Sequence, residues 1–215
     1  IKKLEPFILD RSDAYIGVMI DDLVTKGVSA PYRLFTSRAE YRLSLRSDNA
    51  DQRLTAKGIK IGLISESRKA LYLDKFHKIN QIKLKMSKST ISPTKADKFG
   101  IKIAKDGVKR NAIQILTQKS VNMEKIRKIW PEIKYISREI DEQIEINSHY
   151  KGYLNKQNED IIAFKRDENL IIPDNLNYDK FSGLSNEAKY KFKKIRPKTM
   201  GQALRIDGIT PAAAY

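Results

Sequence analysis

Hydrophobic residues along most of the chain recur every three or four positions, which is the spacing of one face of an α-helix. The apolar run over residues 15–24 ends before Gly27, and a glycine just past the last turn is a common helix terminus. The β-branched residues of this run leave a strand as the alternative. Residues 65–88 are predicted to form a second helix, because Ser65 followed by Glu66 is typical of a helix N-terminus.

Three shorter helices are predicted in the middle of the chain. Ser92 followed by Pro93 has the pattern of an N-cap with proline in the first turn. Residues 111–119 and 122–130 have the length and spacing of two further helices, the second of which stops before a proline. Together with the helix over residues 65–88, these elements predict a small helical subdomain.

The longest predicted element runs from Ser137 to Pro173. Its apolar residues form a stripe at helical steps, interrupted by Gly152 and by the polar Gln157. Such an aliphatic and aromatic stripe is more often packed in a core than stacked on nucleic-acid bases, which is the alternative role.

The tail of the chain is predicted to form two short helices joined by a glycine-bearing turn. Thr199 with Gln202 has the spacing of a capping box, and Thr210 with Pro211 is a capping residue followed by a first-turn proline. This pattern is similar to half of a helix-hairpin-helix element, whose turn presents backbone amides to phosphate. Because residues 208–210 lack the usual second glycine, a plain packing or docking module is the favoured alternative.

Residues 31–53 break the helical pattern. Pro31 forces an extended turn, and the alternation of apolar and polar side chains over residues 41–45 predicts a short strand. Five arginines lie in this segment: Arg33, Arg38, Arg42, Arg46 and Arg53. Guanidinium groups make bidentate contacts with phosphate, so the five are candidates for binding nucleic-acid phosphates. The alternative is a structural ion-pair network in which Arg46 and Arg53 pair with Asp48 and Asp51.

Charge is unevenly distributed along the 215 residues, which carry a formal net charge of +16. Residues 61–135 hold 18 basic and 6 acidic side chains, whereas residues 136–183 hold 6 basic and 10 acidic ones. A positive field on this scale concentrates polyanions, so nucleic acid is the default partner. A lysine-rich solvated surface is the alternative. The acidic stretch is a candidate partner-facing element.

Several kinds of site and location are excluded or disfavoured by the composition. The chain has no cysteine, which excludes disulfide scaffolds, zinc ribbons, iron–sulfur sites and thiol nucleophiles. It has no apolar run of membrane-spanning length, so a cytoplasmic protein without a membrane is expected. Because the chain opens at Ile1 and stops at Tyr215 within an alanine run, we expect it to be a fragment.

The sequence indicates no reaction centre, metal site or bound cofactor of its own. It contains neither a Gly-x-Gly-x-x-Gly fingerprint nor a Walker-type nucleotide loop. His77 and His149 each follow an acidic residue by one helical turn, which predicts ordinary helical ion pairs. The neighbours Asp21 and Asp22 would lie on different faces of a helix, so ion pairing or capping is expected rather than acid–base catalysis.

Three stretches resemble the C-terminal part of the MnmG family, also called GidA. They are the run SDAYIGVMIDDLVTKG over residues 12–27, the run PYRLFTSRAEYRLSLR over residues 31–46 with the residues that follow it to 55, and residues 182–213. Their order is that of the family, with Tyr-Lys-Gly-Tyr at 150–153 between the second and third. Residues 66–135 match loosely, and Ala30 stands where the family usually has a glutamate.

The resemblance implies a role in modifying the wobble uridine of certain tRNAs. Members of the family work with the GTPase MnmE and use FAD and NADH, which bind outside the region seen here, and they form homodimers. The implied fold is mainly α: the C-terminal helical domain of an FAD-dependent protein, with a short extended Arg-rich segment near the N-terminus. The expected domains are residues 1–64, 65–136 and 137–215.

The resemblance also assigns candidate surfaces. Carried over by position, Arg33, Arg38, Arg42 and Arg46 become candidates for tRNA phosphate contacts. Candidates for the MnmE or tRNA surface lie in the tail: Lys189, Lys193, Lys194, Arg196 and Arg205. In isolation the region is expected to bind without catalysing. The contending possibilities are a stand-alone helical RNA- or DNA-binding module and a protein-interaction scaffold.

Overall fold

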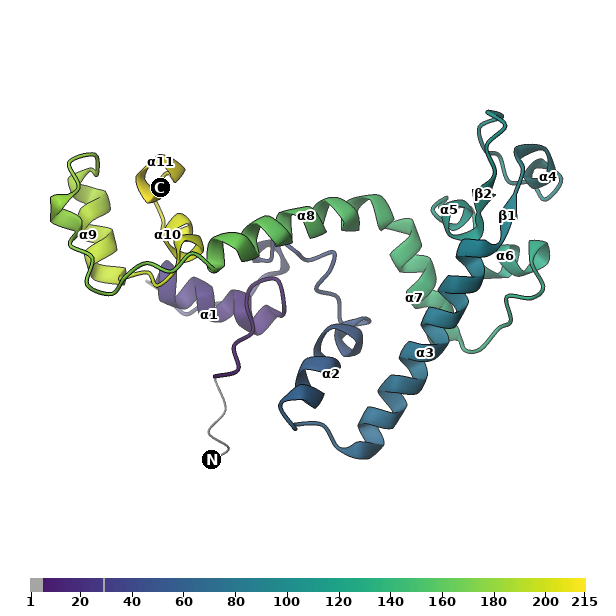
Figure 1. Ribbon diagram of the computed structural model, residues 1–215, viewed down its shortest axis with the longest axis horizontal. Helices are drawn as coiled ribbons and strands as arrows, with labels where there is room; N and C mark the ends of the chain where they lie inside the picture. The colour runs from purple at the N-terminus through teal and green to yellow at the C-terminus, as the bar shows by residue number, and fades with distance from the viewer. Residues whose placement is uncertain (1–5, 29) are drawn as a thin grey trace. The chain divides into compact units, whose positions relative to one another are not determined.

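The computed structural model describes residues 6–28 and 30–215 (Figure 1). Helices dominate the described residues, which confirms the mainly α prediction. Contacts divide the chain into two compact units, residues 46–155 and residues 1–45 joined with 156–215. The division by chain order into residues 1–64, 65–136 and 137–215 stays a prediction. None of the described helices has the length and hydrophobicity that a bilayer span requires.

The unit over residues 46–155 is a set of helices with one small β-ladder. In chain order its elements are α2 (Ala50–Lys60), α3 (Glu66–Lys88), β1 (Thr90–Ile91), α4 (Pro93–Asp97), β2 (Arg110–Asn111), α5 (Ala112–Leu116), α6 (Met123–Ile129), α7 (Arg138–His149) and the start of α8 (Lys151–Glu168). The helices expected over 65–88 and 122–130 are therefore confirmed as α3 and α6. The helix expected over 111–119 is confirmed as α5, which ends three residues earlier, at Leu116. The helix α2 and both strands were not predicted.

Side-chain caps explain where α3, α5 and α7 begin. Ser65 accepts a hydrogen bond from the Arg68 amide at 3.4 Å, and Ser137 accepts one from the Ile140 amide at 3.3 Å. Asn111 forms a full capping box with Gln114 at the start of α5. Each cap satisfies an amide that the first helical turn leaves without a partner.

The strands β1 and β2 pair antiparallel, with Thr90 opposite Asn111 and Ile91 opposite Arg110. Each is two residues long, which is too short to leave a periodic signature in the sequence. One core unites this unit: α3 contributes Ile79, Ile82 and Met86, which pack with buried residues of α5, α6 and α7. Ile115 of α5 is fully buried in it.

The stretch from Ser137 to Pro173 is two helices, not one. The helix α7 ends at His149. The next residue, Tyr150, has a ψ of 7° that departs from helical geometry, and its amide donates to the carbonyls of Ile146 and Ser148. Gly152, the expected interruption, lies inside α8. The longest helix among the described residues is α3, with 23 residues.

The other unit combines the start and the end of the chain. Its elements are α1 (Tyr15–Thr25), the 3-10 helix η1 (Thr36–Arg38), most of α8, the 3-10 helix η2 (Tyr178–Lys180), α9 (Asn186–Ile195), α10 (Met200–Arg205) and α11 (Pro211–Ala214). The helical reading of residues 15–24 is confirmed by α1. Gly27 follows α1 with a φ of 66°, the left-handed conformation expected of a glycine terminus.

The strand predicted over residues 41–45 is wrong. These residues form turns in which the amides of Ser44 and Leu45 both bond to the Tyr41 carbonyl at 2.9 Å. An alternating pattern becomes a strand only beside a pairing strand, and this segment has none among the described residues. The apolar side chains pack instead: Leu45 is buried with Ala39 against Val18 of α1.

The tail folds as expected into short helices with their own core, but Thr210, the expected capping residue of α11, makes no side-chain hydrogen bond to that helix. Thr199 accepts a hydrogen bond from the Gln202 amide at 3.1 Å, which is half of the expected capping box. The Gln202 side chain bonds to the Lys198 amide instead of completing the box. The tail core comprises Ala188, Phe192, Ala203, Ile206 and Ile209. Gly208, in the turn before α11, has a φ of 75°.

Removing the centre of the larger core should unfold the unit over residues 46–155. We expect Ile115→Ala to lower the free energy of unfolding by about 2–5 kcal/mol, because it leaves a cavity at a fully buried site. Leu71→Ala is the matched control, since Leu71 is 73% exposed on α3 and its loss should cost less than about 0.5 kcal/mol. Urea denaturation followed by circular dichroism measures both, and equal effects would contradict this packing.

Candidate nucleic-acid interface

A close backbone crossing fixes the start of the described chain against α1. A β-carbon placed on Gly17 would lie 2.1 Å from the Asp10 carbonyl oxygen, so only glycine permits this crossing. Asp10 then turns the chain, because its carboxylate accepts hydrogen bonds from the amide and hydroxyl of Ser12 at 2.7 and 2.6 Å. The turn directs the side chain of Arg11 into the interior.

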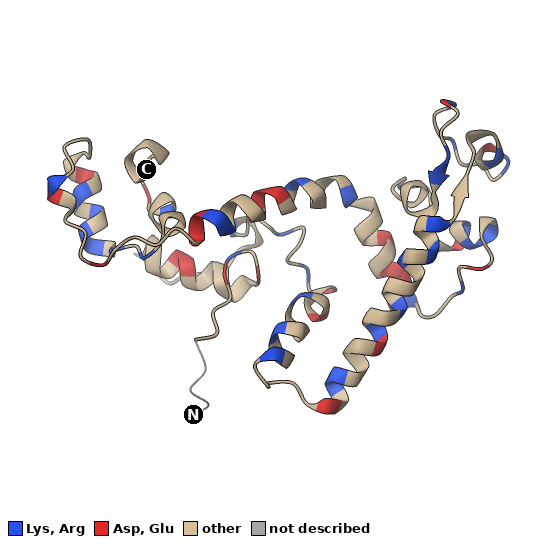
Figure 2. Ribbon diagram, viewed as in Figure 1, with Lys and Arg blue, Asp and Glu red and all other residues tan. Residues whose placement is uncertain are grey.

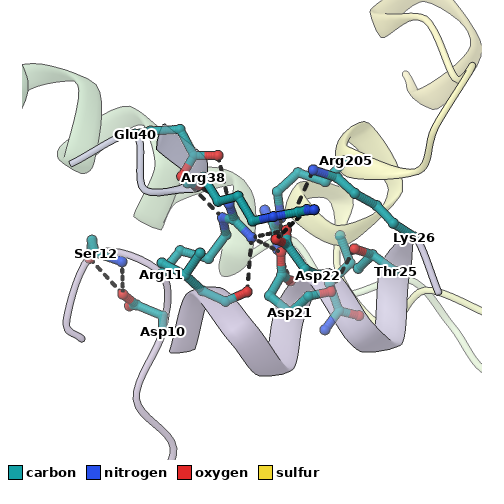
Figure 3. Close-up of polar contacts among 12 residues, drawn as sticks. Asp10, Arg11, Ser12, Asp21, Asp22, Thr25, Lys26, Arg38, Glu40 and Arg205 are labelled. Atoms are coloured by element: carbon teal, nitrogen blue, oxygen red, sulfur yellow. Dashed lines mark hydrogen bonds and ion pairs between the residues drawn. The ribbon is translucent and has the colours of Figure 1, made fainter. Parts of the chain in front are cut away.

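Arg11 is the centre of a buried charge network (Figure 3). Its side chain is 2% exposed and donates to Asp21 at 3.0 Å and to Asp22 at 2.7 Å, both on α1. The other side of the guanidinium donates to the Glu40 carboxylate at 2.7 Å and to the backbone carbonyl of Arg38 at 3.0 Å. One side chain therefore ties α1 to residues 38–40, and the pKa of its guanidinium rises despite the burial that opposes it.

Asp22 is the most enclosed carboxylate of this network. It is 2% exposed, and besides Arg11 it accepts a hydrogen bond from the Tyr32 hydroxyl at 2.8 Å. Lys26 and Arg38 lie 3.4 and 3.5 Å from it. Burial alone would raise the pKa of Asp22, but the hydrogen bonds from Arg11 and Tyr32 outweigh burial and hold that pKa below its ordinary value.

Three arginines of the sequence-predicted set are exposed: Arg33, Arg38 and Arg42. Of these, Arg38 lies beside the network, 3.5 Å from Asp22. The guanidinium of Arg38 lies 4.9 Å from the ring centroid of Tyr32, and that of Arg33 lies 5.2 Å from the ring of Phe35. These cation–π contacts orient both guanidinium groups, and that of Arg38 also pairs with Asp22. Neither Arg33 nor Arg42 forms an ion pair within the described ranges 6–28 and 30–215.

The turn that carries Arg42 is held in place by α8. The side-chain oxygen of Gln157 accepts hydrogen bonds from the Ser44 amide at 2.9 Å and the Ser44 hydroxyl at 2.7 Å. Its amide nitrogen donates to the Glu40 carbonyl at 3.1 Å. Gln157 is thus a positioning residue that sequence reasoning treated only as a break in an apolar stripe. The signal in the sequence that could have indicated this role was a side-chain amide on an otherwise apolar helical face.

Arg46 and Arg53 have internal partners in the other unit. Arg46 pairs with Asp48 at 3.0 Å and donates to Asn147 at 2.8 Å. Arg53 donates to Asn49 at 2.8 Å and to the Arg46 carbonyl at 3.2 Å. The ion-pair alternative is therefore confirmed for Arg46 with Asp48.

Asp51 does not pair with Arg53, contrary to that alternative. Its carboxylate instead accepts from Lys75 of α3 at 2.7 Å. Asp48 also accepts a hydrogen bond from Gln143 at 2.7 Å. These contacts give the carboxylates of residues 48–51 a structural role within their unit.

Arg205 differs from the expectation of a surface residue. Its guanidinium forms a bidentate pair with Asp21, both contacts at 2.7 Å, and also donates to Glu168 at 2.7 Å. The side chain is 17% exposed and lies over the ring of Phe164. A buried guanidinium requires carboxylate partners, and those of Arg205 lie on two other helices. Arg205 therefore joins α10 to α1 and α8. The salt-bridge role expected for Asp21 and Asp22 is confirmed by these contacts.

The other tail candidates are divided between paired and exposed side chains. Lys193 pairs with Asp179 at 2.5 Å, and the Lys189 amine donates to the Asp179 carbonyl at 3.3 Å. Lys194 and Arg196 are exposed, and Arg196 ends α9 with a φ of 49°. Of the five tail candidates, Lys194 and Arg196 are therefore the exposed cations that have no ion pair among the described residues.

The two histidines do not form the ion pairs expected of them. His77 contacts the side chain of Gln81 at 2.7 Å, while Asp74 pairs with Lys78. A ring nitrogen of His149 lies 3.2 Å from the Val121 carbonyl, while Glu145 accepts from the Met123 amide. Within the described residues, no group of acidic and histidine side chains could hold a metal ion.

Two family models match consecutive parts of the chain. The model described as the tRNA modifying enzyme MnmG/GidA C-terminal helical domain matches residues 66–158. The model described as the tRNA modifying enzyme MnmG/GidA C-terminal helical bundle matches residues 160–215. The chain belongs to the MnmG/GidA family.

Relatives and solved structures agree with this membership in the C-terminal region of MnmG/GidA. A tRNA uridine 5-carboxymethylaminomethyl modification enzyme MnmG from Geobacillus kaustophilus is 46% identical over 97% of this chain and 34% of its own length. One from Caldicellulosiruptor saccharolyticus is 46% identical over 99% of this chain and 34% of its own length. The chain therefore spans about a third of the length of these MnmG relatives.

The solved structure of Aquifex aeolicus GidA in its form II crystal matches with a TM-score of 0.78 and 37% identity. The match covers 98% of this chain and 33% of the Aquifex chain. The expectation of an MnmG/GidA C-terminal helical region is thus confirmed both by sequence and by fold.

The depressed pKa of Asp22 predicts an acid-sensitive structure. An unfolded aspartate titrates near pH 3.9, so the stabilisation from Asp22 is fully present above about pH 4 and is lost as pH falls through the lower folded pKa. Asp22→Asn should therefore have a lower free energy of unfolding than the parent chain at pH 7. The difference between the two chains should be smaller at pH 3. Urea denaturation at pH 7, 5 and 3 measures this convergence.

Asp174→Asn is the control for that experiment, because Asp174 is exposed. It should leave the free energy of unfolding unchanged at each pH. A constant difference between the parent chain and Asp22→Asn from pH 7 to pH 3 would contradict the proposed linkage.

Proposed function

We propose that this chain is the RNA-binding and partner-docking region of an enzyme that modifies the wobble uridine of tRNA. In this proposal the complete enzyme acts with the GTPase MnmE and adds a carboxymethylaminomethyl or aminomethyl group to the base. The observation that carries the RNA-binding role is the exposed set Arg33, Arg38 and Arg42. The backbone near two of them is held in place, by the buried side chain of Arg11 at Arg38 and by Gln157 in the turn that carries Arg42. The relatives are tRNA uridine modification enzymes, which is why tRNA is proposed as the RNA.

The arginine set suits phosphate recognition for three physical reasons. Its guanidinium groups are exposed, and those of Arg33 and Arg38 are oriented by aromatic rings. The backbone that carries Arg38 and Arg42 is fixed by Arg11 and Gln157, so little conformational entropy is lost on binding. Within the described part of the chain, neither Arg33 nor Arg42 has a carboxylate partner to give up when a phosphate arrives.

The chemistry of the reaction is assigned to other parts of the enzyme. FAD and NADH, the cofactors implied for the family, supply redox chemistry when bound. A dinucleotide site needs a glycine-rich turn between a strand and a helix. The two strands of the described residues are two residues long and are followed by no such turn. This chain's residues do not fit these cofactors, and its proposed contribution is binding RNA and orienting it.

The tail is proposed to dock MnmE. Lys194 and Arg196 present exposed charge at the end of α9, on a small module with its own core. A second copy of the enzyme is a further proposed partner, as homodimers are implied for the family. The stand-alone nucleic-acid-binding module is not favoured, because the matched relatives extend well beyond this region.

Removing two arginines should weaken tRNA binding without unfolding the chain. We expect Arg33→Gln with Arg42→Gln to lower the affinity for a tRNA transcript with an unmodified wobble uridine by about tenfold, and to reduce the slope of log affinity against log salt by about two. Arg38 is left in place because it contributes to the environment of Asp22. Filter binding at several salt concentrations measures both quantities.

The matched control for charge is Arg138→Gln with Arg166→Gln, since these side chains are 87% and 71% exposed. It removes the same charge and should change the affinity less than about threefold. Residues 31–45, which carry Arg33, Arg38 and Arg42, are called the arginine segment below. If the two double variants weaken binding equally, the arginine segment is not a tRNA site.

Reversing charge on the tail should separate partner docking from RNA binding. Lys194→Glu with Arg196→Glu should weaken association with MnmE while changing the affinity for tRNA by less than about threefold, since rim charges govern steering and partner choice. Lys60→Glu with Lys151→Glu is the control on exposed lysines outside the tail. Sedimentation or surface plasmon resonance measures association, and parallel loss of both partners would reject separate docking.

A further inference from the structure

A second cationic surface lies in the unit over residues 46–155, away from the arginine segment in the sequence. Residues 95–110 hold six basic and two acidic side chains. Each acidic side chain has a basic partner: Asp97 pairs with Lys105 at 3.6 Å and Asp106 with Arg110 at 2.6 Å. Figure 2 shows this excess of Lys and Arg on α4 and around β2.

Four lysines remain in this stretch without a carboxylate partner among the described residues: Lys95, Lys98, Lys102 and Lys109. All four are exposed. Lys95 lies on α4, and the other three lie on residues 98–109, which connect α4 to β2 and are called the basic loop below.

The first half of the basic loop is fastened to the core. The Ile101 side chain is 2% exposed within the core of its unit. The amides of Gly100 and Ile101 bond to the carbonyls of Asp97 and Ala96 at 3.0 and 3.2 Å, with Gly100 at a φ of 71°. The Lys102 carbonyl accepts a hydrogen bond from the Gln118 side chain at 3.1 Å.

The second half is ordered by a turn at its tip. Asp106 accepts a hydrogen bond from the Val108 amide at 3.0 Å, and Gly107 adopts a φ of 75°. Arg110 of β2 donates to the Val108 carbonyl at 2.9 Å and pairs with Asp106. These two contacts hold the turn against β2. The pairing of β2 with β1 closes the loop at its base. The lysines therefore project from a fixed backbone.

One aromatic side chain is exposed among these lysines. Phe99 is 43% exposed and follows Lys98 directly. Ammonium groups contact phosphates as point charges, and an exposed aromatic ring can stack on an unpaired base. A fixed loop with both features fits single-stranded nucleotides better than a regular duplex, whose bases are already stacked.

We propose that the basic loop, with Lys95, is a second RNA site that binds an unpaired region of the tRNA. Lys95, Lys98, Lys102 and Lys109 contact its phosphates, and Phe99 stacks on one of its bases. The inference rests on the proposed function, because it takes tRNA as the substrate. It adds a contact surface separate from Arg33, Arg38 and Arg42.

The test replaces Lys95, Lys98, Lys102 and Lys109 together by Gln in the 215-residue chain. The matched control replaces Lys60, Lys151, Lys156 and Lys180 by Gln, which removes equal charge from exposed lysines elsewhere. Binding is measured to a tRNA transcript and to a duplex RNA of similar length at several salt concentrations. We expect the loop variant to lose about tenfold or more in tRNA affinity and to reduce the salt slope by about two or more, and the control to lose less than about threefold.

A single substitution tests the stacking role. Phe99→Ala should weaken tRNA binding by about fivefold or more and leave duplex binding unchanged, since stacking requires a free base. Circular dichroism of each variant checks that the helices persist. An unchanged tRNA affinity for Phe99→Ala would remove the base contact from the proposal.

The outcomes distinguish this inference from the proposed function. If the loop variant and its control weaken tRNA binding equally, the loss is due to net charge alone, and the second site is overturned. Full tRNA affinity in the loop variant, with loss only in Arg33→Gln and Arg42→Gln, would overturn the second site and retain the proposed function. A parent chain that does not prefer tRNA to duplex RNA would overturn both.

Discussion

The unit of residues 1–45 and 156–215 depends on the ion pairs of one buried guanidinium group, that of Arg11. A buried cation is unfavourable unless carboxylates and carbonyls surround it, and Arg11 meets Asp21, Asp22 and Glu40 from two separate segments. Arg205 repeats the arrangement from the tail side by sharing Asp21. The two arginines on one carboxylate connect α1, the arginine segment and α10 through directional contacts, which fix register in a way that apolar packing alone does not.

The small number of buried carboxylates explains why some arginines are buried in ion pairs and others stay exposed. Some guanidinium groups are used to build the unit, and others are left at its surface because the carboxylates nearby are already engaged. Asp22 illustrates the limit: Arg11 and Tyr32 occupy it closely, so Arg38 approaches only to 3.5 Å and stays exposed. Surface cations thus arise here from competition for a small number of buried anions.

Local signals in the sequence predicted most helices, because caps such as Ser65 and Ser137 act within one turn. Features that depend on distant residues escaped prediction. Asp21 and Arg205 are 184 positions apart, so no local pattern could show that the tail arginine is buried. The family resemblance identified the region correctly, but the internal partners of Arg46 and Arg205 emerged only when the folded chain brought Asn147 and Glu168 beside them.

The discontinuous make-up of this unit has a consequence for biosynthesis. Residues 46–155 form a contiguous unit that can fold as soon as it leaves the ribosome, whereas the unit of residues 1–45 and 156–215 must wait for the last helices. The Gln157 contacts to Ser44 close a loop of 113 residues, and closing long loops slows folding. The arginine segment is therefore synthesised before the residues that fix its position. A premature stop in the tail before Arg205 would leave Asp21 without one of its two arginine partners.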